Sequence, residues 1–152
     1  MGRFPLLVNM AGEKVLIFGG GSVGERKARL FAREGGDVMV VGTEFTDSLK
    51  EMSEESNLDG EIELVKEKIE PSDMRGLIEE AKLVIIGTDN EELNDELTEV
   101  ADEAKVLVNK ADELSTPVMI PSVIKKRNLI LSISTGGKSP AMCKFLRLKL
   151  ED

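Results

Sequence analysis

Residues 14–28, KVLIFGGGSVGERKA, join an apolar segment to three glycines spaced as Gly19-x-Gly21-x-x-Gly24 and then to a helical pattern. A bound dinucleotide needs this order of elements. The first glycine permits a tight turn, the second lets the backbone approach a pyrophosphate, and the third lets helix and strand pack closely. A helix beginning near Ser22 also directs unpaired N–H groups and its positive dipole end at the phosphates. The flanking strand and helix therefore favour a nucleotide site over a merely flexible glycine loop.

An acidic side chain follows these glycines at the distance typical of ribose recognition. Glu44 lies 20 residues after Gly24, and a carboxylate there usually binds the adenine-side ribose hydroxyls. Glu44 falls slightly beyond the expected strand end, so an acid at a helix N-terminus is an equally open interpretation. No Arg or Lys occurs between Gly42 and Ser48 to receive a 2′-phosphate. The sequence therefore favours NAD over NADP.

Two more candidates follow expected strands. Gly87 and Thr88 leave room for a cofactor to lie across the fourth strand, although a plain strand-to-helix turn would use the same residues. Asp112 follows the fifth strand. Dehydrogenation removes a hydride and a proton, and a carboxylate at the edge of the site can accept that proton. From its position alone, Asp112 fits this catalytic role or that of a surface-loop aspartate.

A sheet whose strands end at one edge would bring these candidates together. Alternating strand and helix patterns predict an α/β fold with a doubly wound parallel sheet of the Rossmann type. Short apolar runs such as Val84–Ile86 suit strands buried on both faces, and Asp89 or Asn90 would cap the fourth helix. Ligands of such sheets bind beyond the carboxyl ends of the strands. The expected strands are 14–18, 37–41, 62–66, 83–86 and 106–108, and the expected helices are 22–33, 46–56, 72–81 and 91–104.

The pattern changes after Asn109. An apolar segment between Pro117 and Pro121, a basic stretch and an alternating strand at 129–134 predict a hairpin-like unit. Ser139 can then cap a final helix that has Pro140 at its first position. We expect an NAD-binding domain over 1–112 and a short β/α extension over 113–152. The extension is expected to form a homodimer, through apolar residues that would face a core or a partner: Phe145, Leu146, Leu148 and Leu150.

Composition limits the other functions. The chain has 152 residues, of which 41% are hydrophobic, enough for one core of ordinary domain size. The absence of Trp and Tyr removes stacking platforms for single-stranded nucleic acid. No apolar run approaches the ~20 residues of a membrane span, and we expect a cytoplasmic protein without a signal peptide. With no His and one cysteine, Cys143, we predict no metal ligands and no internal disulfide.

The net charge of −9 conceals a strong asymmetry. Residues 1–113 carry 13 Lys and Arg against 27 Asp and Glu, whereas residues 114–150 carry seven basic residues and no acidic one. The two ends could attract each other or a partner subunit, or the basic end could bind a substrate with several carboxylates. Charge alone leaves both interpretations open.

Six short motifs together resemble the precorrin-2 dehydrogenase family, the dehydrogenase and ferrochelatase module of siroheme synthases. The resemblance covers residues 4–148 and departs from the family pattern at Ser22, Gly24 and 113–116. The motifs are Phe4-Pro5-Leu6, GGGSVGERKA at 19–28, Gly87-Thr88-Asp89, Val108-Asn109-x-x-Asp112, Ile120-Pro121-Ser122 and STGGKSP at 134–140.

The resemblance implies NAD-dependent oxidation of precorrin-2 to sirohydrochlorin, a step toward siroheme and related tetrapyrroles. The substrate, a polycarboxylate tetrapyrrole, would account for the basic end of the chain. Sirohydrochlorin ferrochelatase activity, alone or in addition, and a non-catalytic NAD-sensing module are the alternatives. By position, Ser22, Val23, Thr43 and Glu44 would contact NAD, Asp112 would be the acid–base carboxylate, and Thr135, Gly136, Gly137 and Lys138 would bind substrate.

Overall fold

The computed structural model describes residues 2–55, 58–111 and 116–151. The chain forms two compact units, Leu7–Glu113 and Met1–Leu6 together with Leu114–Asp152. The first six residues thus group with the end of the chain, whereas the sequence places them with the nucleotide-binding sheet. One contact within this unit is a hydrogen bond, in which Arg3 Nη1 donates to the carbonyl oxygen of Thr116 at 3.1 Å.

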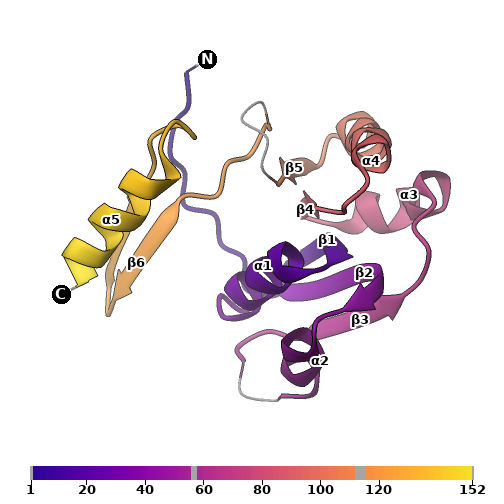
Figure 1. The fold of residues 1–152 in the computed structure, drawn as a ribbon, viewed down its shortest axis with the longest axis horizontal. Helices are drawn as coiled ribbons and strands as arrows, with labels where there is room; N and C mark the ends of the chain where they lie inside the picture. Colours follow the sequence, from indigo (N-terminus) through magenta and orange to yellow (C-terminus); the bar gives the residue numbers. More distant parts are fainter. Residues whose placement is uncertain (1, 56–57, 112–115, 152) are drawn as a thin grey trace. The chain divides into compact units, whose positions relative to one another are not determined.

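The first unit contains a five-stranded sheet in which all neighbouring strands are parallel (Figure 1). Its strand order is β3-β2-β1-β4-β5, so the chain moves outward from β1 in one direction and then crosses back to continue on the other side. This is the doubly wound topology that the sequence predicts. The strands are β1 (Lys14–Gly20), β2 (Asp37–Phe45), β3 (Ile62–Lys66), β4 (Leu83–Ile86) and β5 (Leu107–Lys110).

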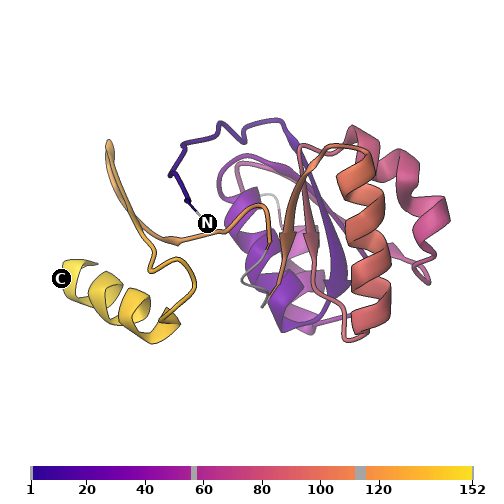
Figure 2. The same cartoon turned by 90° about the horizontal axis from the view of Figure 1, so that it is seen from above.

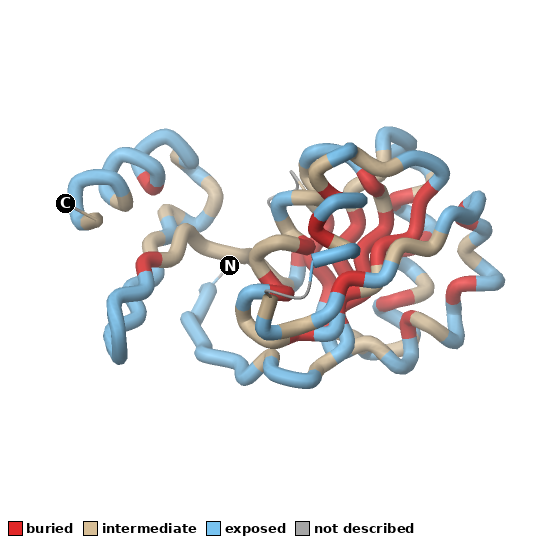
Figure 3. The backbone as a smooth tube through the Cα atoms, turned by 90° about the horizontal axis from the view of Figure 1, so that it is seen from below, coloured by how far each residue is buried: buried red, intermediate tan, exposed pale blue. Residues whose placement is uncertain are grey.

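Four helices cover this sheet. Helix α1 lies on one face, whereas α3 and α4 lie on the other (Figure 2). Every residue of β4 is buried, as expected for a central strand packed on both faces, and buried residues concentrate in the strands (Figure 3). The helices are α1 (Ser22–Ala32), α2 (Asp47–Glu54), α3 (Pro71–Glu80) and α4 (Glu91–Glu103).

Strand β2 continues four residues beyond the end that the sequence predicts. The pairing of β1 with β2 shifts register after Phe18, so that Gly20 pairs with Phe45. The backbone of β1 therefore keeps β2 extended through a segment whose own residues do not read as a strand. Glu44 consequently lies within β2 and not beyond it.

The second unit is an antiparallel hairpin with a helix. Strands β6 (Ser122–Lys126) and β7 (Leu129–Ile133) pair across a two-residue turn, and α5 (Pro140–Glu151) contacts both strands. The predicted cap of α5 is confirmed, since Ser139 Oγ accepts a hydrogen bond from the N–H of Met142 at 3.2 Å. Across the described residues, no helix has the length and apolar character needed to cross a membrane.

Candidate functional site

A cleft of about 750 Å³ lies at the carboxyl ends of the strands in the first unit. The connections from β1 and from β3 leave in opposite directions, so the gap between β1 and β4 is the switch point where ligands of doubly wound sheets bind. The volume falls within the ~300–1,000 Å³ usual for small-molecule sites. Six of the predicted cofactor residues line the cleft: Gly19, Gly21, Thr43, Glu44, Gly87 and Thr88.

The glycine turn needs its first and third glycines for close backbone contacts. Gly19 has φ +107°, and a Cβ there would lie under 3.0 Å from the carbonyl oxygen of Gly87. A Cβ at Gly24 would meet the carbonyl oxygen of Gly19 equally closely. Any side chain at either position would therefore push α1 or β4 away from the turn.

The second glycine is different, because a Cβ at Gly21 would meet no protein atom within 4 Å. Gly21 is also the N-cap of α1, a helix start with no side-chain cap among the described residues. The first helical hydrogen bond runs from the N–H of Glu25 to the oxygen of Gly21, at 2.9 Å. The N–H groups of Ser22, Val23 and Gly24 precede that bond and lack helical acceptors. Open space beside free donors fits the pyrophosphate of a dinucleotide.

Ser22, Val23 and Gly24 are not among the residues that line the cleft. They form the first turn of α1, and the side chain of Val23 lies close to Gly87. The lining itself comes from Gly19–Gly21, from the segments that end or follow β2, β3 and β4, and from the beginning of α4.

A polar network fixes the end of β2 that carries Glu44. Thr46 Oγ1 donates to Glu25 Oε2 at 2.8 Å, and the N–H of Thr46 donates to the carbonyl oxygen of Gly20 at 3.1 Å. Arg29 Nη2 donates to Glu25 Oε1 and to Ser48 Oγ, both at 2.8 Å. The Thr46 hydroxyl is the main cause that lowers the pKa of Glu25, and Ser48 and Arg29 add to it while burial opposes it. The network joins α1 and α2 to the glycine turn.

We expect Glu25→Gln to lower the free energy of unfolding at neutral pH by about 1–2 kcal/mol, because it removes charge-assisted hydrogen bonds. The folded-state pKa of Glu25 is lowered from the ordinary value of 4.5. Its contribution is thus present above that value and is lost as the pH falls through the folded-state pKa. Urea unfolding at neutral pH and near pH 3 would show the difference between variant and wild type shrinking in acid. Glu99→Gln, on the exposed face of α4, is the control, and a pH-independent difference would contradict this role for Glu25.

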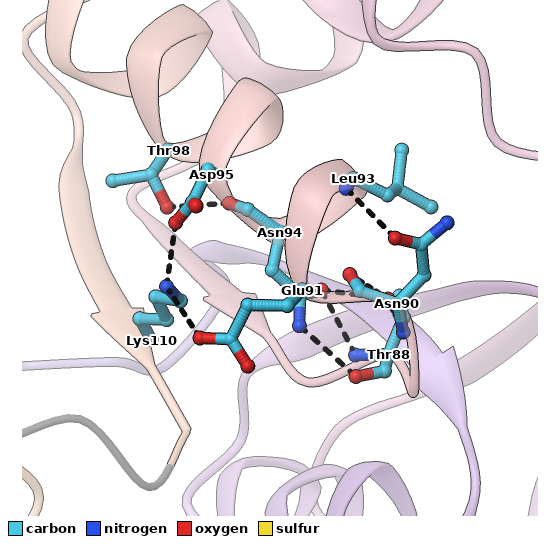
Figure 4. Close-up of polar contacts among 8 residues, drawn as sticks. All are labelled: Thr88, Asn90, Glu91, Leu93, Asn94, Asp95, Thr98 and Lys110. Carbon is cyan, nitrogen blue, oxygen red and sulfur yellow. Dashed lines mark hydrogen bonds and ion pairs between the residues drawn. The ribbon is translucent and has the colours of Figure 1, made fainter.

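The turn after β4 is held by Asn94 of α4 (Figure 4). Asn94 Oδ1 accepts from the N–H of Thr88 at 3.2 Å and from Thr88 Oγ1 at 2.6 Å, while Asn94 Nδ2 donates to the carbonyl oxygen of Thr88 at 3.0 Å. Asn90 caps α4 through the N–H of Leu93 at 3.2 Å, which decides between the two predicted caps. Hydrogen bonds of Asn94 therefore hold the turn itself, and the hydrogen bond of Asn90 holds the start of α4.

Lys68 and Asn94 are among the residues of this region that the sequence interpretation missed. Lys68 lines the cleft after β3, and the same rule about carboxyl ends of strands would have found it. Asn94 is 8% exposed, and its position within the α4 pattern gives no signal beyond an amide among apolar neighbours. Its role depends on the fold of the turn before it.

The predicted catalytic residue, Asp112, lies outside the described residues. Lys110, at the end of β5, comes two positions earlier. Its side chain is only 10% exposed, and its Nζ lies 2.7 Å from Asp95 Oδ1 and 3.6 Å from Glu91 Oε1 (Figure 4). These ion pairs hold the end of β5 against the beginning of α4.

The predicted substrate residues lie in the second unit, between β7 and α5. Thr135 Oγ1 accepts from the N–H of Ser139 at 2.8 Å and lies 3.7 Å from the buried Cys143 Sγ. Gly136 and Gly137 have φ values of +64° and +84°, a conformation that favours glycine. Lys138 is next, directly before the capping Ser139.

Comparison with known proteins finds relatives that match almost the whole chain. Precorrin-2 dehydrogenase of Methanosarcina barkeri (strain Fusaro / DSM 804) is 44% identical over 97% of this chain and 64% of its own length. Siroheme synthase 3 of Aeromonas hydrophila subsp. hydrophila is 33% identical over 99% of this chain and 31% of its own length. The resemblance found from the motifs is thereby confirmed. The chain spans just under two thirds of the first relative and about a third of the second.

A solved structure, titled "SirC, precorrin-2 dehydrogenase", shares the fold with a TM-score of 0.75 and 24% sequence identity, and the match covers 97% of this chain and 69% of that one. A family model described as "Putative NAD(P)-binding" matches residues 6–122. That match contains the glycine turn, the end of β2 and the turn after β4. The chain therefore belongs to this NAD(P)-binding family.

Proposed function

We propose that the protein is a precorrin-2 dehydrogenase, which oxidises precorrin-2 to sirohydrochlorin with NAD as the acceptor. The observation that carries the proposal is the glycine-lined cleft at the switch point of a chain that is 44% identical, over 97% of its length, to a precorrin-2 dehydrogenase.

The residues of the cleft suit each part of NAD. Gly19 and Gly21 would leave room for the pyrophosphate, and the N–H groups of Ser22, Val23 and Gly24 would donate to it. Thr43 and Glu44, at the end of β2, would bind the adenine-side ribose. Gly87 and Thr88 would support the half of the dinucleotide that crosses β4. When bound, NAD supplies the hydride acceptor.

Charge in the cleft supports NAD over NADP. Among the described residues that line it, one is a cation, Lys68. Lys68 donates a hydrogen bond to Glu70, which raises the pKa of the Lys68 ammonium and partly offsets its charge. An additional 2′-phosphate would therefore meet net repulsion. The acidic lining residues are Glu44, Glu70, Asp89, Glu92 and Glu96.

Asp112 is the proposed acid–base residue. The oxidation removes two hydrogens from the substrate, one as a hydride and one as a proton. A carboxylate just past the end of β5 would take the proton directly or through one water. The ion pairs of Lys110 with Asp95 and Glu91 support this assignment, because they fix the strand that leads to Asp112.

The basic second unit is the proposed binding surface for the substrate. Residues 116–150 contain no acidic residue, and Thr135, Gly136, Gly137 and Lys138 form the loop before α5. A tetrapyrrole with several carboxylates would be attracted to this surface. Exposed apolar side chains on α5, including Phe145, Leu148 and Leu150, support a homodimer. A cytoplasmic location stays a prediction of the sequence.

An anaerobic assay with three arms tests the proposal. The first arm contains precorrin-2 with NAD, the second contains sirohydrochlorin with ferrous iron, and the third contains precorrin-2 with both NAD and ferrous iron. We expect NADH and sirohydrochlorin to form in the first arm without added metal. Iron insertion confined to the second arm would favour a ferrochelatase. NAD binding without turnover or tetrapyrrole binding would favour an NAD-sensing module.

A further inference from the structure

Both polar atoms of the Asn94 side-chain amide form hydrogen bonds with Thr88, a residue that lines the cleft. Its oxygen accepts from the backbone N–H and the hydroxyl of Thr88, and its nitrogen donates to the backbone carbonyl of Thr88 (Figure 4). Only a side chain with an acceptor and a donor can satisfy both backbone groups at once. At 8% exposure, water competes poorly for these groups, so losing one partner leaves the other buried and unsatisfied.

The segment that Asn94 holds also packs against the glycine turn. The nearest atoms to a Cβ built at Gly19 are the carbonyl oxygen and carbon of Gly87 and the nitrogen of Thr88. The N–H of Gly87 in turn donates to the carbonyl oxygen of Phe18 at 3.0 Å. A shift of Thr88 would therefore change the width of the cleft between the turns after β1 and β4.

Asn94 itself is not among the residues that line the cleft. It stands in α4 between the lining residues Leu93 and Glu96, and Thr98 Oγ1 donates to its backbone carbonyl at 2.7 Å. We propose that Asn94 is a positioning residue, which sets the dinucleotide affinity of the cleft by fixing both backbone polar groups of Thr88. This inference rests on the proposed function, because it requires that the cleft bind NAD.

Asn94→Asp tests the inference at one atom. The substitution keeps the acceptor for the N–H of Thr88 but replaces the donor with a carboxylate oxygen that faces a carbonyl. We expect the dissociation constant for NAD at pH 8 to rise about tenfold or more. Burial raises the pKa of an introduced carboxyl, so near pH 5 it would be protonated and could donate to Thr88 again. Much of the lost affinity should then return, a reversal that general destabilisation would not produce.

The charged groups drawn nearby, Glu91, Asp95 and Lys110, are common to variant and wild type, and Lys110 forms an ion pair with each of the two carboxylates. Wild type measured at both pH values corrects for their titration. Asn9→Asp is the matched control, since exposed Asn9 only accepts, from the N–H of Ala11 at 3.2 Å, and an aspartate can do the same. Its affinity for NAD should equal that of wild type.

The readout is isothermal titration with NAD, alongside thermal unfolding of each variant. The inference would be overturned if Asn94→Asp bound NAD as tightly as wild type does, or if it lost the same affinity at both pH values. If it does not fold, Asn94→Ala decides. That variant removes every bond of the amide to Thr88 without introducing a charge, and it should weaken binding about tenfold; unchanged binding would overturn the inference. Wild type that fails to bind NAD would instead refute the proposed function, on which the inference depends.

Discussion

Gly21→Ala is expected to weaken NAD binding by about tenfold or more and to leave the stability of the protein almost unchanged. The added methyl group would meet no protein atom within 4 Å, and Gly21 has φ −76°, which any residue adopts. It would occupy the space through which the pyrophosphate approaches the backbone, and overpacking of that kind costs about 1–3 kcal/mol. Isothermal titration with NAD and urea unfolding measure the two quantities.

Two matched substitutions separate this effect from folding. Gly19→Ala places a side chain at φ +107° against the Gly87 carbonyl, so it should lose about 2–4 kcal/mol of stability as well as NAD binding. Gly76→Ala lies on the exposed face of α3 with open space around it. It should gain about 0.5–1 kcal/mol and bind NAD normally. If Gly21→Ala bound NAD as tightly as Gly76→Ala, the pyrophosphate would not lie at this turn.

Asp112→Asn is expected to lower turnover by about 100-fold to 10,000-fold while NAD binds with unchanged affinity. The amide keeps the shape of the carboxylate but cannot accept a proton, and general base catalysis contributes this much in other enzymes. Single-turnover NADH formation under anaerobic conditions gives the rate, and titration gives the affinity. Glu113→Gln, the adjacent carboxylate, should keep full turnover. Equal rates for both variants and wild type would remove Asp112 from the chemistry.

The fold was predictable because its signals are local. Most strands of the sheet contain a short apolar run, and the helices between them follow the helical period, so the five strands and the doubly wound order could be predicted from the sequence. The end of β2 could not be predicted from the sequence, since it depends on the pairing of Phe45 with Gly20. The grouping of the first six residues with the second unit likewise joins segments far apart in the sequence, such as Arg3 and Thr116.

The candidate site likewise contains residues that the sequence predicts and residues that it does not. The three glycines at 19–24 are close in the sequence, so their spacing, together with the flanking strand and helix, predicted the position of the cleft. Lys68 follows β3 and lines the same cleft, as the rule about carboxyl ends of strands implies, whereas Asn94 reaches the region from α4 and only the folded chain brings it there. The amide of Asn94 gains its significance from three bonds to Thr88, which no residue pattern encodes.

The most direct measurement is the ratio of NADH formed to precorrin-2 consumed by the wild-type protein, under anaerobic conditions and without added metal. The proposed dehydrogenase predicts one NADH for each sirohydrochlorin, because one hydride leaves each substrate molecule. Sirohydrochlorin formation without NADH, or no turnover by protein that binds NAD, would contradict it.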